Sequence, residues 1–277
     1  MAPKLSLAPA LSARSPFYYG WVIAGVMGAV SFSSVAFTPV LIGLFFRGMA
    51  SDFGWSITLL SGAQLGGSVI ALFLSPVAGR LQDRYGARIV LSASMGIIVL
   101  CLFLMGLITS PLMYYVVLGL GVGIVVGPIR ISPAATIAQW FVRRRGAATS
   151  ILGIGISLGF AILPLLGALV SAHLGWRAGW WAIGTVVAVV ALPSCFLLLL
   201  RHPTDIGQQV DGDAPSRSGL PASQRERSAS SEVQWTTKEA VRTPALWLLV
   251  LSTSCIVLTF MGLSTHLVPF LVDRGIT

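Results

Sequence analysis

The chain has 277 residues, of which 55% are hydrophobic and only 10% are charged. Average soluble domains carry about 25% charged residues, so this composition excludes an ordinary soluble globular protein. The net charge of +9 would suit a nucleic-acid-binding protein, but the basic residues lie between long apolar runs and not in one basic patch, so no nucleic-acid partner is expected. The apolar runs recur along the chain, with a mean hydropathy of +0.86, and predict a protein that crosses the lipid bilayer several times.

The three cysteines, Cys101, Cys195 and Cys255, all lie within apolar runs. This placement matches neither a metal-binding spacing nor a disulfide framework, so we predict no metal site, no cofactor and no disulfide. The first apolar run is longer than the ~7–15-residue core of a signal peptide, so we expect it to be retained as a helix.

In chain order, residues 1–17 are predicted to form a cytoplasmic arm. The first predicted helix runs from Tyr18 to Phe46, and the aromatic residues at its start suit the membrane interface. A polar turn is predicted over Arg47–Trp55 and a second helix over Ser56–Ala78.

The connector that follows, Gly79–Arg88, reads G-R-L-Q-D-R-Y-G-A-R and concentrates charge between two apolar runs. Because glycine tolerates the backbone angles of a chain reversal, we expect Gly79 to end one helix and Gly86 to begin the next. Asp83 is then expected near the start of the following helix, where free amides and the helix dipole stabilise a carboxylate.

Five further helices are predicted, and the basic triplet Arg143–Arg145 lies between the fourth and fifth helices of the chain. The predicted ranges are Ile89–Ile108, Leu112–Trp140, Ala147–Ala172, Gly179–Leu200 and Ala245–Leu271. The sequence therefore predicts an all-α polytopic membrane protein with seven transmembrane helices.

The segment 201–234 is polar and contains many serines and several prolines. Such a composition buries too little apolar surface to fold alone, so we predict a flexible linker. Thr236 and Glu239 have the spacing of a capping box and predict a short surface helix. The predicted organisation is an arm at 1–17, a six-helix bundle at 18–200, a cytoplasmic linker at 201–244 and the seventh helix at 245–277.

The distribution of basic residues predicts the orientation in the membrane. With the N-terminus in the cytoplasm, 14 of the 18 Lys and Arg residues fall on the inner side and 3 on the outer side, while Arg130 lies within a span. Since basic residues favour cytoplasmic loops, we predict a multi-pass protein of the plasma membrane, in bacterial terms the inner membrane, with its N-terminus inside.

The connector Gly79–Arg88 resembles the loop between helices 2 and 3 of the major facilitator superfamily, whose pattern is G-x-L-x-D-R-x-G-x-R. The matching residues are Gly79, Leu81, Asp83, Arg84, Gly86 and Arg88. The resemblance implies a six-helix bundle of two inverted three-helix repeats, with substrate bound near mid-membrane between two such bundles. Helices 8 to 12 of such a transporter are not in the sequence, so we expect a fragment, or a half that pairs with a second polypeptide.

Short segments elsewhere resemble the monocarboxylate transporter branch of that superfamily and its oxalate/formate antiporter relatives. They are Tyr19–Trp21, Phe53–Ser56, Trp140–Gly146, Gly175–Arg177 and Glu239–Pro244. This resemblance implies a small organic anion, such as a monocarboxylate, as the substrate. The superfamily's antiporter pattern places a proline directly after a glycine on helix 5, whereas Pro164 does not directly follow a glycine here. Symport, antiport and uniport therefore all stay open as the transport mode, and so does the use of a coupling proton.

Arg130 is the main candidate for substrate binding. It lies about 11 residues, or ~16 Å, from the inner end of the fourth predicted helix. An arginine in lipid costs at least ~2.5–3.5 kcal/mol, so it should face the bundle or a water-filled cavity. All nine acidic residues fall in loops or at helix ends, which leaves a carboxylate substrate as its candidate partner. The alternative is a structural arginine, bonded to free carbonyls near Pro128 and Pro133 or paired with the absent half.

Other polar residues in the spans are weaker candidates. Gln64, Ser33, Ser34 and Thr38 are candidate cavity liners, although such groups also form hydrogen bonds between helices. His266 is a candidate substrate-binding or proton-linked group, and the alternative is a histidine hydrogen-bonded near the interface.

The connector and the basic triplet together predict a conformational switch. Salt bridges of Asp83 with Arg84 and Arg88, close to Arg143–Arg145, would hold the inner side shut and break when the transporter rocks. The alternative is that these basic residues only set the topology.

Two other functional classes were weighed against a secondary active transporter. An intramembrane enzyme needs a nucleophile, a base or metal ligands at one depth, and the spans offer no carboxylate, so we predict no enzyme. A non-transporting membrane partner or sensor subunit derived from a transporter half is the alternative that remains.

Overall fold

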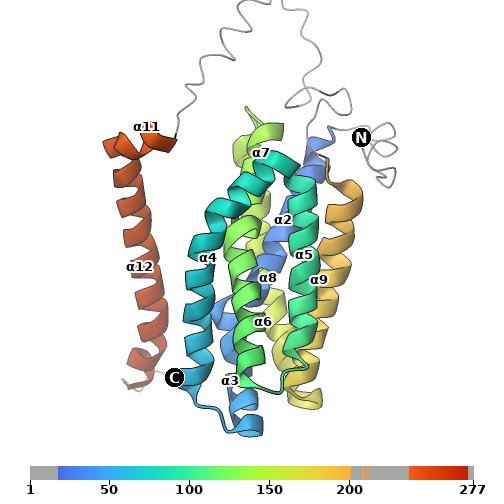
Figure 1. The fold of residues 1–277 in the computed structure, drawn as a ribbon, viewed down its shortest axis with the longest axis vertical. Helices are drawn as coiled ribbons and strands as arrows, with labels where there is room; N and C mark the ends of the chain where they lie inside the picture. The colour runs from blue at the N-terminus through green and yellow to red at the C-terminus, as the bar shows by residue number, and fades with distance from the viewer. Residues whose placement is uncertain (1–17, 201–207, 209–210, 212–236, 274–277) are drawn as a thin grey trace, which may run out of the picture. The chain divides into compact units, whose positions relative to one another are not determined.

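The computed structural model describes residues 18–200, 208, 211 and 237–273. The chain divides into two compact units, 1–216 and 217–277. The first unit holds six helical spans that are long and apolar enough to cross a membrane (Figure 1). The second holds α11 (Thr237–Arg242) and α12 (Pro244–Asp273), and the described part of α12 is a shorter apolar stretch.

The spans of the first unit have these bounds. Span 1 consists of α2 (Gly20–Ser33), the 3₁₀ turn η1 (Ser34–Phe37) and α3 (Pro39–Phe53). Spans 2 and 3 are α4 (Ile57–Tyr85) and α5 (Ala87–Met105). Span 4 consists of α6 (Pro111–Ile124), the π-helical turn η2 (Val125–Ile129) and α7 (Arg130–Trp140). Spans 5 and 6 are α8 (Arg145–Leu174) and α9 (Trp176–Leu198).

The packing of the spans follows a two-fold pattern. The most extensive contacts are those of α2 with α8, α4 with α6, and α5 with α9. Exchanging spans 1 to 3 with spans 4 to 6 turns the first pair into the second and leaves the third unchanged, as expected for two inverted three-helix repeats. The predicted all-α fold built from such repeats is confirmed.

Spans 1 and 4, which occupy equivalent places in the two repeats, are both interrupted. The sequence predicted continuous helices here, but α2 and α6 each end after 14 residues. Proline is the physical reason. Pro39 favours an extended Thr38 (φ −79°, ψ 153°), while Pro128 and Pro133 have no N–H to continue the hydrogen-bond ladder.

Two predicted helix ends are wrong. Helix α3 continues through most of the predicted polar turn and ends at Gly54, which has a φ of 69°. Helix α4 continues through Gly79 to Tyr85. Of the two glycines in the connector, Gly86, with a φ of 82°, is the one that ends a helix. Asp83 therefore lies in the last turn of α4 and not at the start of the next helix, so the predicted dipole interaction is wrong. An interior glycine costs a helix only about 1 kcal/mol, which is too little to stop a long apolar span.

Candidate functional site

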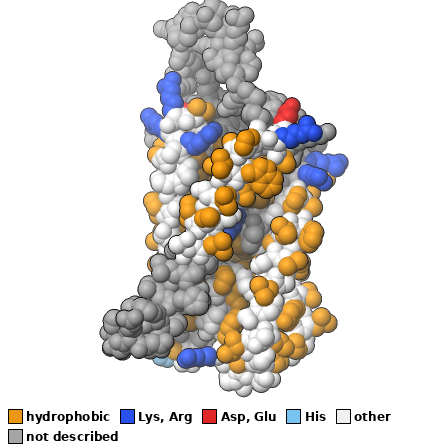
Figure 2. Space-filling model, turned by 90° about the vertical axis from the view of Figure 1, so that its left-hand side faces the viewer, with side chains coloured by type: hydrophobic (Ala, Val, Ile, Leu, Met, Phe, Trp, Pro, Cys, Tyr) orange, Lys and Arg blue, Asp and Glu red, His pale blue; other side chains and the backbone are white. Residues whose placement is uncertain are grey.

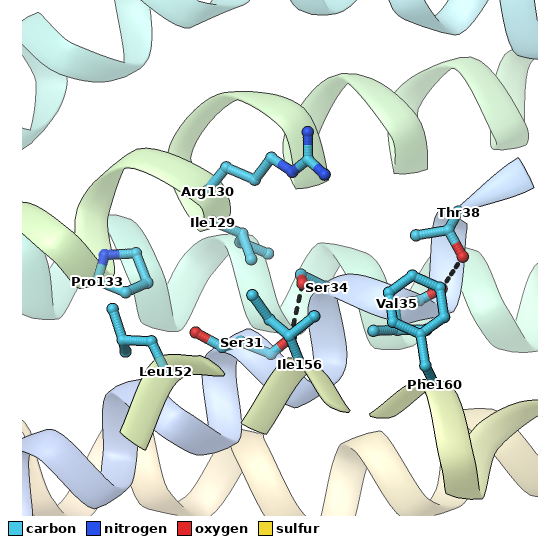
Figure 3. A pocket seen from close by; sticks show the side chains of 10 residues that line it. All are labelled: Ser31, Ser34, Val35, Thr38, Ile129, Arg130, Pro133, Leu152, Ile156 and Phe160. Atoms are coloured by element: carbon cyan, nitrogen blue, oxygen red, sulfur yellow. Dashed lines mark hydrogen bonds between the residues drawn. The ribbon is translucent and has the colours of Figure 1, made fainter. Parts of the chain in front are cut away.

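A cavity of about 110 Å³ lies where the two interrupted spans meet. Spans 1, 4 and 5 contribute its lining (Figure 3). The lining residues are Ser31, Ser34, Val35, Thr38, Ile129, Arg130, Pro133, Leu152, Ile156 and Phe160. The cavity therefore combines one cation and several hydroxyl groups with an apolar wall.

Arg130 is the first residue of α7, directly after the π-helical turn. Its side chain is exposed, and Figure 3 shows it extending past Ile129. Within the described part of the chain, its guanidinium forms no hydrogen bond and no ion pair, so the alternative of an arginine bonded to nearby carbonyls is not observed there. A π-helical turn is rare and is frequently found at functional sites.

Two hydroxyl groups beside the cavity donate hydrogen bonds to backbone carbonyls. The Ser34 hydroxyl donates to the carbonyl of Ser31 at 2.6 Å, and the Thr38 hydroxyl donates to that of Val35 at 2.8 Å. The lone pairs of both oxygens are left to accept hydrogen bonds. Thr38 directly precedes α3 but makes no side-chain capping hydrogen bond to it.

The structure brings only some of the predicted liners together. Arg130, Ser34 and Thr38 line the cavity. Ser33 is fully buried, and its hydroxyl donates to the Ala29 carbonyl at 3.0 Å, so it points elsewhere. Gln64 is on α4, away from this lining, and its Oε1 atom is buried without a partner in the described structure. His266 belongs to α12, and its side chain lies outside the described residues.

The sequence analysis missed the apolar wall of the cavity. Leu152, Ile156 and Phe160 recur every four residues on α8 and so share one face of that helix. This spacing was a usable signal. Ser31 is one turn before Ser34, and both line the cavity beside the fourth span.

The predicted switch residues gather at one end of the bundle, near the ends of α4, α7 and α9. Arg88 donates to the Phe196 carbonyl at 2.9 Å, and Arg145 donates to those of Phe141 and Ala138 at 3.3 and 3.2 Å. Cations are favoured at such carbonyl ends of helices. The side chain of Asp83 is outside the described residues, so its salt bridges stay a prediction.

At the opposite end of the bundle, an ion pair links spans 1 and 6. Asp52 accepts hydrogen bonds from Arg177 at 2.9 Å and from the Trp176 indole at 2.8 Å. The Arg177 guanidinium also lies over the Trp176 and Phe53 rings, at 4.4 and 5.4 Å from their centroids. This cluster unites two of the short segments that the sequence analysis noted separately.

The comparisons with known proteins agree with this architecture. Residues 26–277 match the family model of the Major Facilitator Superfamily. The chain is 31% identical to the Staphyloferrin B transporter of Staphylococcus aureus, over 58% of this chain and 39% of that protein. It is 30% identical to Monocarboxylate transporter 3 of Mus musculus, over 60% of this chain and 34% of that protein.

A relative with a different role is also similar. The Membrane sensor protein UhpC of Salmonella typhimurium is 30% identical over 46% of this chain and 28% of its own length. The chain thus spans less than half the length of each of these relatives. With a match over nearly its whole length and the six-span bundle of two inverted repeats, the chain belongs to the Major Facilitator Superfamily of membrane proteins.

Proposed function

We propose that this chain contributes one wall of a secondary active transporter for a small organic anion, and that Arg130 binds the anion. The observation that carries the proposal is Arg130 itself, which lines a cavity among the membrane spans and whose guanidinium has no partner in the described structure. A charged side chain within a membrane span costs free energy and commonly marks a substrate or ion pathway. A guanidinium binds a carboxylate through two parallel hydrogen bonds.

The surroundings of Arg130 support this assignment. The cavity forms where spans 1 and 4 are interrupted, and transporters commonly bind substrates at such breaks. Its hydroxyl oxygens and its apolar wall suit a small anion with a short hydrocarbon part. The name of one relative, Monocarboxylate transporter 3, agrees with an organic anion.

The transporter would work by alternating access, with this bundle rocking against a second one supplied by further chain or by another polypeptide. In this view the bilayer is the bacterial inner membrane and the N-terminus is cytoplasmic. The basic residues at the connector and the triplet support that orientation.

The test is uptake of a labelled monocarboxylate by membrane vesicles that contain the whole protein. Arg130→Gln should reduce uptake by ~30-fold or more, since losing one partner of a desolvated charge pair costs at least ~2 kcal/mol. Arg130→Lys should keep an intermediate rate, because it retains the charge without the bidentate geometry. Arg47→Gln is the control, since Arg47 is exposed on α3 and outside the cavity lining.

Two outcomes would contradict the proposal. Normal uptake by Arg130→Gln would remove Arg130 from the site. Anion binding without uptake or counterflow in the unmodified protein would favour the second candidate function, a non-transporting sensor, for which the similarity to UhpC is the supporting observation.

A further inference from the structure

The described residues of the segment after α9 contact the inner ends of the spans. Residues 201–234 were predicted as a flexible linker, yet Gln208 and Asp211 both form hydrogen bonds with the bundle. The Asp211 carboxylate accepts hydrogen bonds from the backbone N–H groups of Val142, Arg143 and Arg144, and its shortest N···O distance is 2.7 Å.

The three amides that Asp211 binds lie between the end of α7 and the start of α8. Helix α7 ends at Trp140, Phe141 has an extended backbone (φ −129°, ψ 132°), and α8 begins at Arg145. The N–H groups before and within the first turn of a helix lack intrahelical acceptors, and the helix dipole favours an anion there. One carboxylate from a distant part of the chain thus accepts from three successive backbone N–H groups.

Asp211 holds an uncommon backbone conformation in this position. Its φ of 62° makes it the one non-glycine residue with positive φ in the described part of the chain. Aspartate and asparagine tolerate this region better than most residues, yet it still has to be held by surrounding contacts. The contacts with the 142–144 backbone provide that support.

A second side chain of the same segment binds a different span. The Oε1 atom of Gln208 accepts a hydrogen bond from the Tyr19 N–H at 3.2 Å, directly before α2. The Tyr19 hydroxyl donates to the Leu198 carbonyl at 2.8 Å, which fixes the start of span 1 to the end of span 6.

We propose that Asp211, assisted by Gln208, is an anchor that docks the linker onto the inner ends of spans 1 and 5. The loop that carries the basic triplet and the part of the linker at Gln208 and Asp211 then move as one body. The carboxylate is essential, because its two oxygens receive all three amides.

Hydrogen–deuterium exchange of the whole protein in detergent or lipid nanodiscs tests the anchor. In Asp211→Ala, the amides of residues 142–144 should exchange about tenfold faster or more, since a charge-assisted hydrogen bond is worth ~1.5–3 kcal/mol. Asn tolerates the same backbone angles as Asp, so Asp211→Asn tests the carboxylate charge without changing the backbone conformation. The amides of residues 142–144 should exchange faster in this variant than in the unmodified protein. Asp213→Asn removes a carboxylate two residues away and is the matched control.

A second measurement follows the linker itself. A nitroxide attached at Gln209→Cys, in a background without other cysteines, should be immobilised in the parent and mobile in Asp211→Ala. Unchanged exchange at 142–144 in Asp211→Ala, or an equal effect of Asp213→Asn, would overturn the proposal. Exchange within α5 reports whether each variant is folded, and neither readout depends on transport activity.

Discussion

Arg130 differs from the other arginines around the bundle in what surrounds its charge. Arg88 and Arg145 donate to helix carbonyls, and Arg177 pairs with Asp52. These three have protein acceptors at the two ends of the bundle, whereas Arg130 lines the cavity and its guanidinium has no acceptor among the described residues. This contrast supports the proposal that Arg130 binds an external anion.

Two glycines on α8 differ in the space available for a side chain. A Cβ atom at Gly155 would collide with the backbone carbonyl of Gly28 on α2, whereas one at Gly153 would meet open space. Gly155→Ala should therefore separate α2 from α8 and lower stability by ~1–3 kcal/mol, as overpacking does. Gly153→Ala is the control and should leave stability unchanged or slightly higher, because alanine favours a helix. Thermal unfolding of the purified protein in detergent compares the two, and equal melting temperatures would contradict the packing argument.

At the scale of elements, the breaks in spans 1 and 4 decide where the cavity forms. Each break begins after a 14-residue helix, and the two spans are related by the repeat symmetry. The inverted repeats thus bring two irregular turns, η1 and η2, into contact with each other. Irregular backbone within a membrane is tolerated where it is buried in protein or lines a cavity.

The π-helical turn in span 4 should position Arg130. Pro128→Ala restores an N–H that can donate to the Ile124 carbonyl, which favours an ordinary α-helical turn. When a π-helical turn becomes an α-helical turn, the helix after it rotates by about 100° relative to the helix before it. This rotation turns Arg130 away from the cavity. We expect monocarboxylate uptake to fall about tenfold or more while thermal stability is kept, since interior proline costs a helix ~3 kcal/mol. Pro111→Ala, at the first turn of α6, is the control. Normal uptake by Pro128→Ala would contradict the positioning role.

At the scale of the whole bundle, the connections fall into two groups at opposite ends. The connector at Gly86 and the loop after α7 lie at one end, where Arg88 reaches the end of α9 and Tyr18 donates to the Trp140 carbonyl. The turn after α3 and the start of α9 lie at the other, joined by Asp52. In Figure 2, apolar side chains cover much of the visible middle of the bundle, as a surface in contact with lipid requires.

Cysteine labelling tests the predicted orientation of this bundle. Val142 and Thr109 are exposed in loops at opposite ends. In a Cys255→Ser background, a membrane-impermeant maleimide should label Thr109→Cys in right-side-out vesicles at once, and Val142→Cys only after permeabilisation. The reason is that the basic loops are retained in the cytoplasm. The reverse pattern would place the N-terminus outside and overturn the predicted topology.

The amino-acid sequence by itself determined the membrane class, the number and order of the helices and the superfamily, because long apolar runs and a charged connector are local features. It also identified Arg130 as a candidate for substrate binding, since a charge inside an apolar run is visible without a structure. The tertiary structure decided the interruption of spans 1 and 4, the passage of α4 through Gly79, and the grouping of Ser34 and Thr38 with Arg130. It also placed Asp211 on amides almost 70 residues earlier in the chain. These features depend on which helices pack together, and non-local packing is not encoded in any single stretch of sequence.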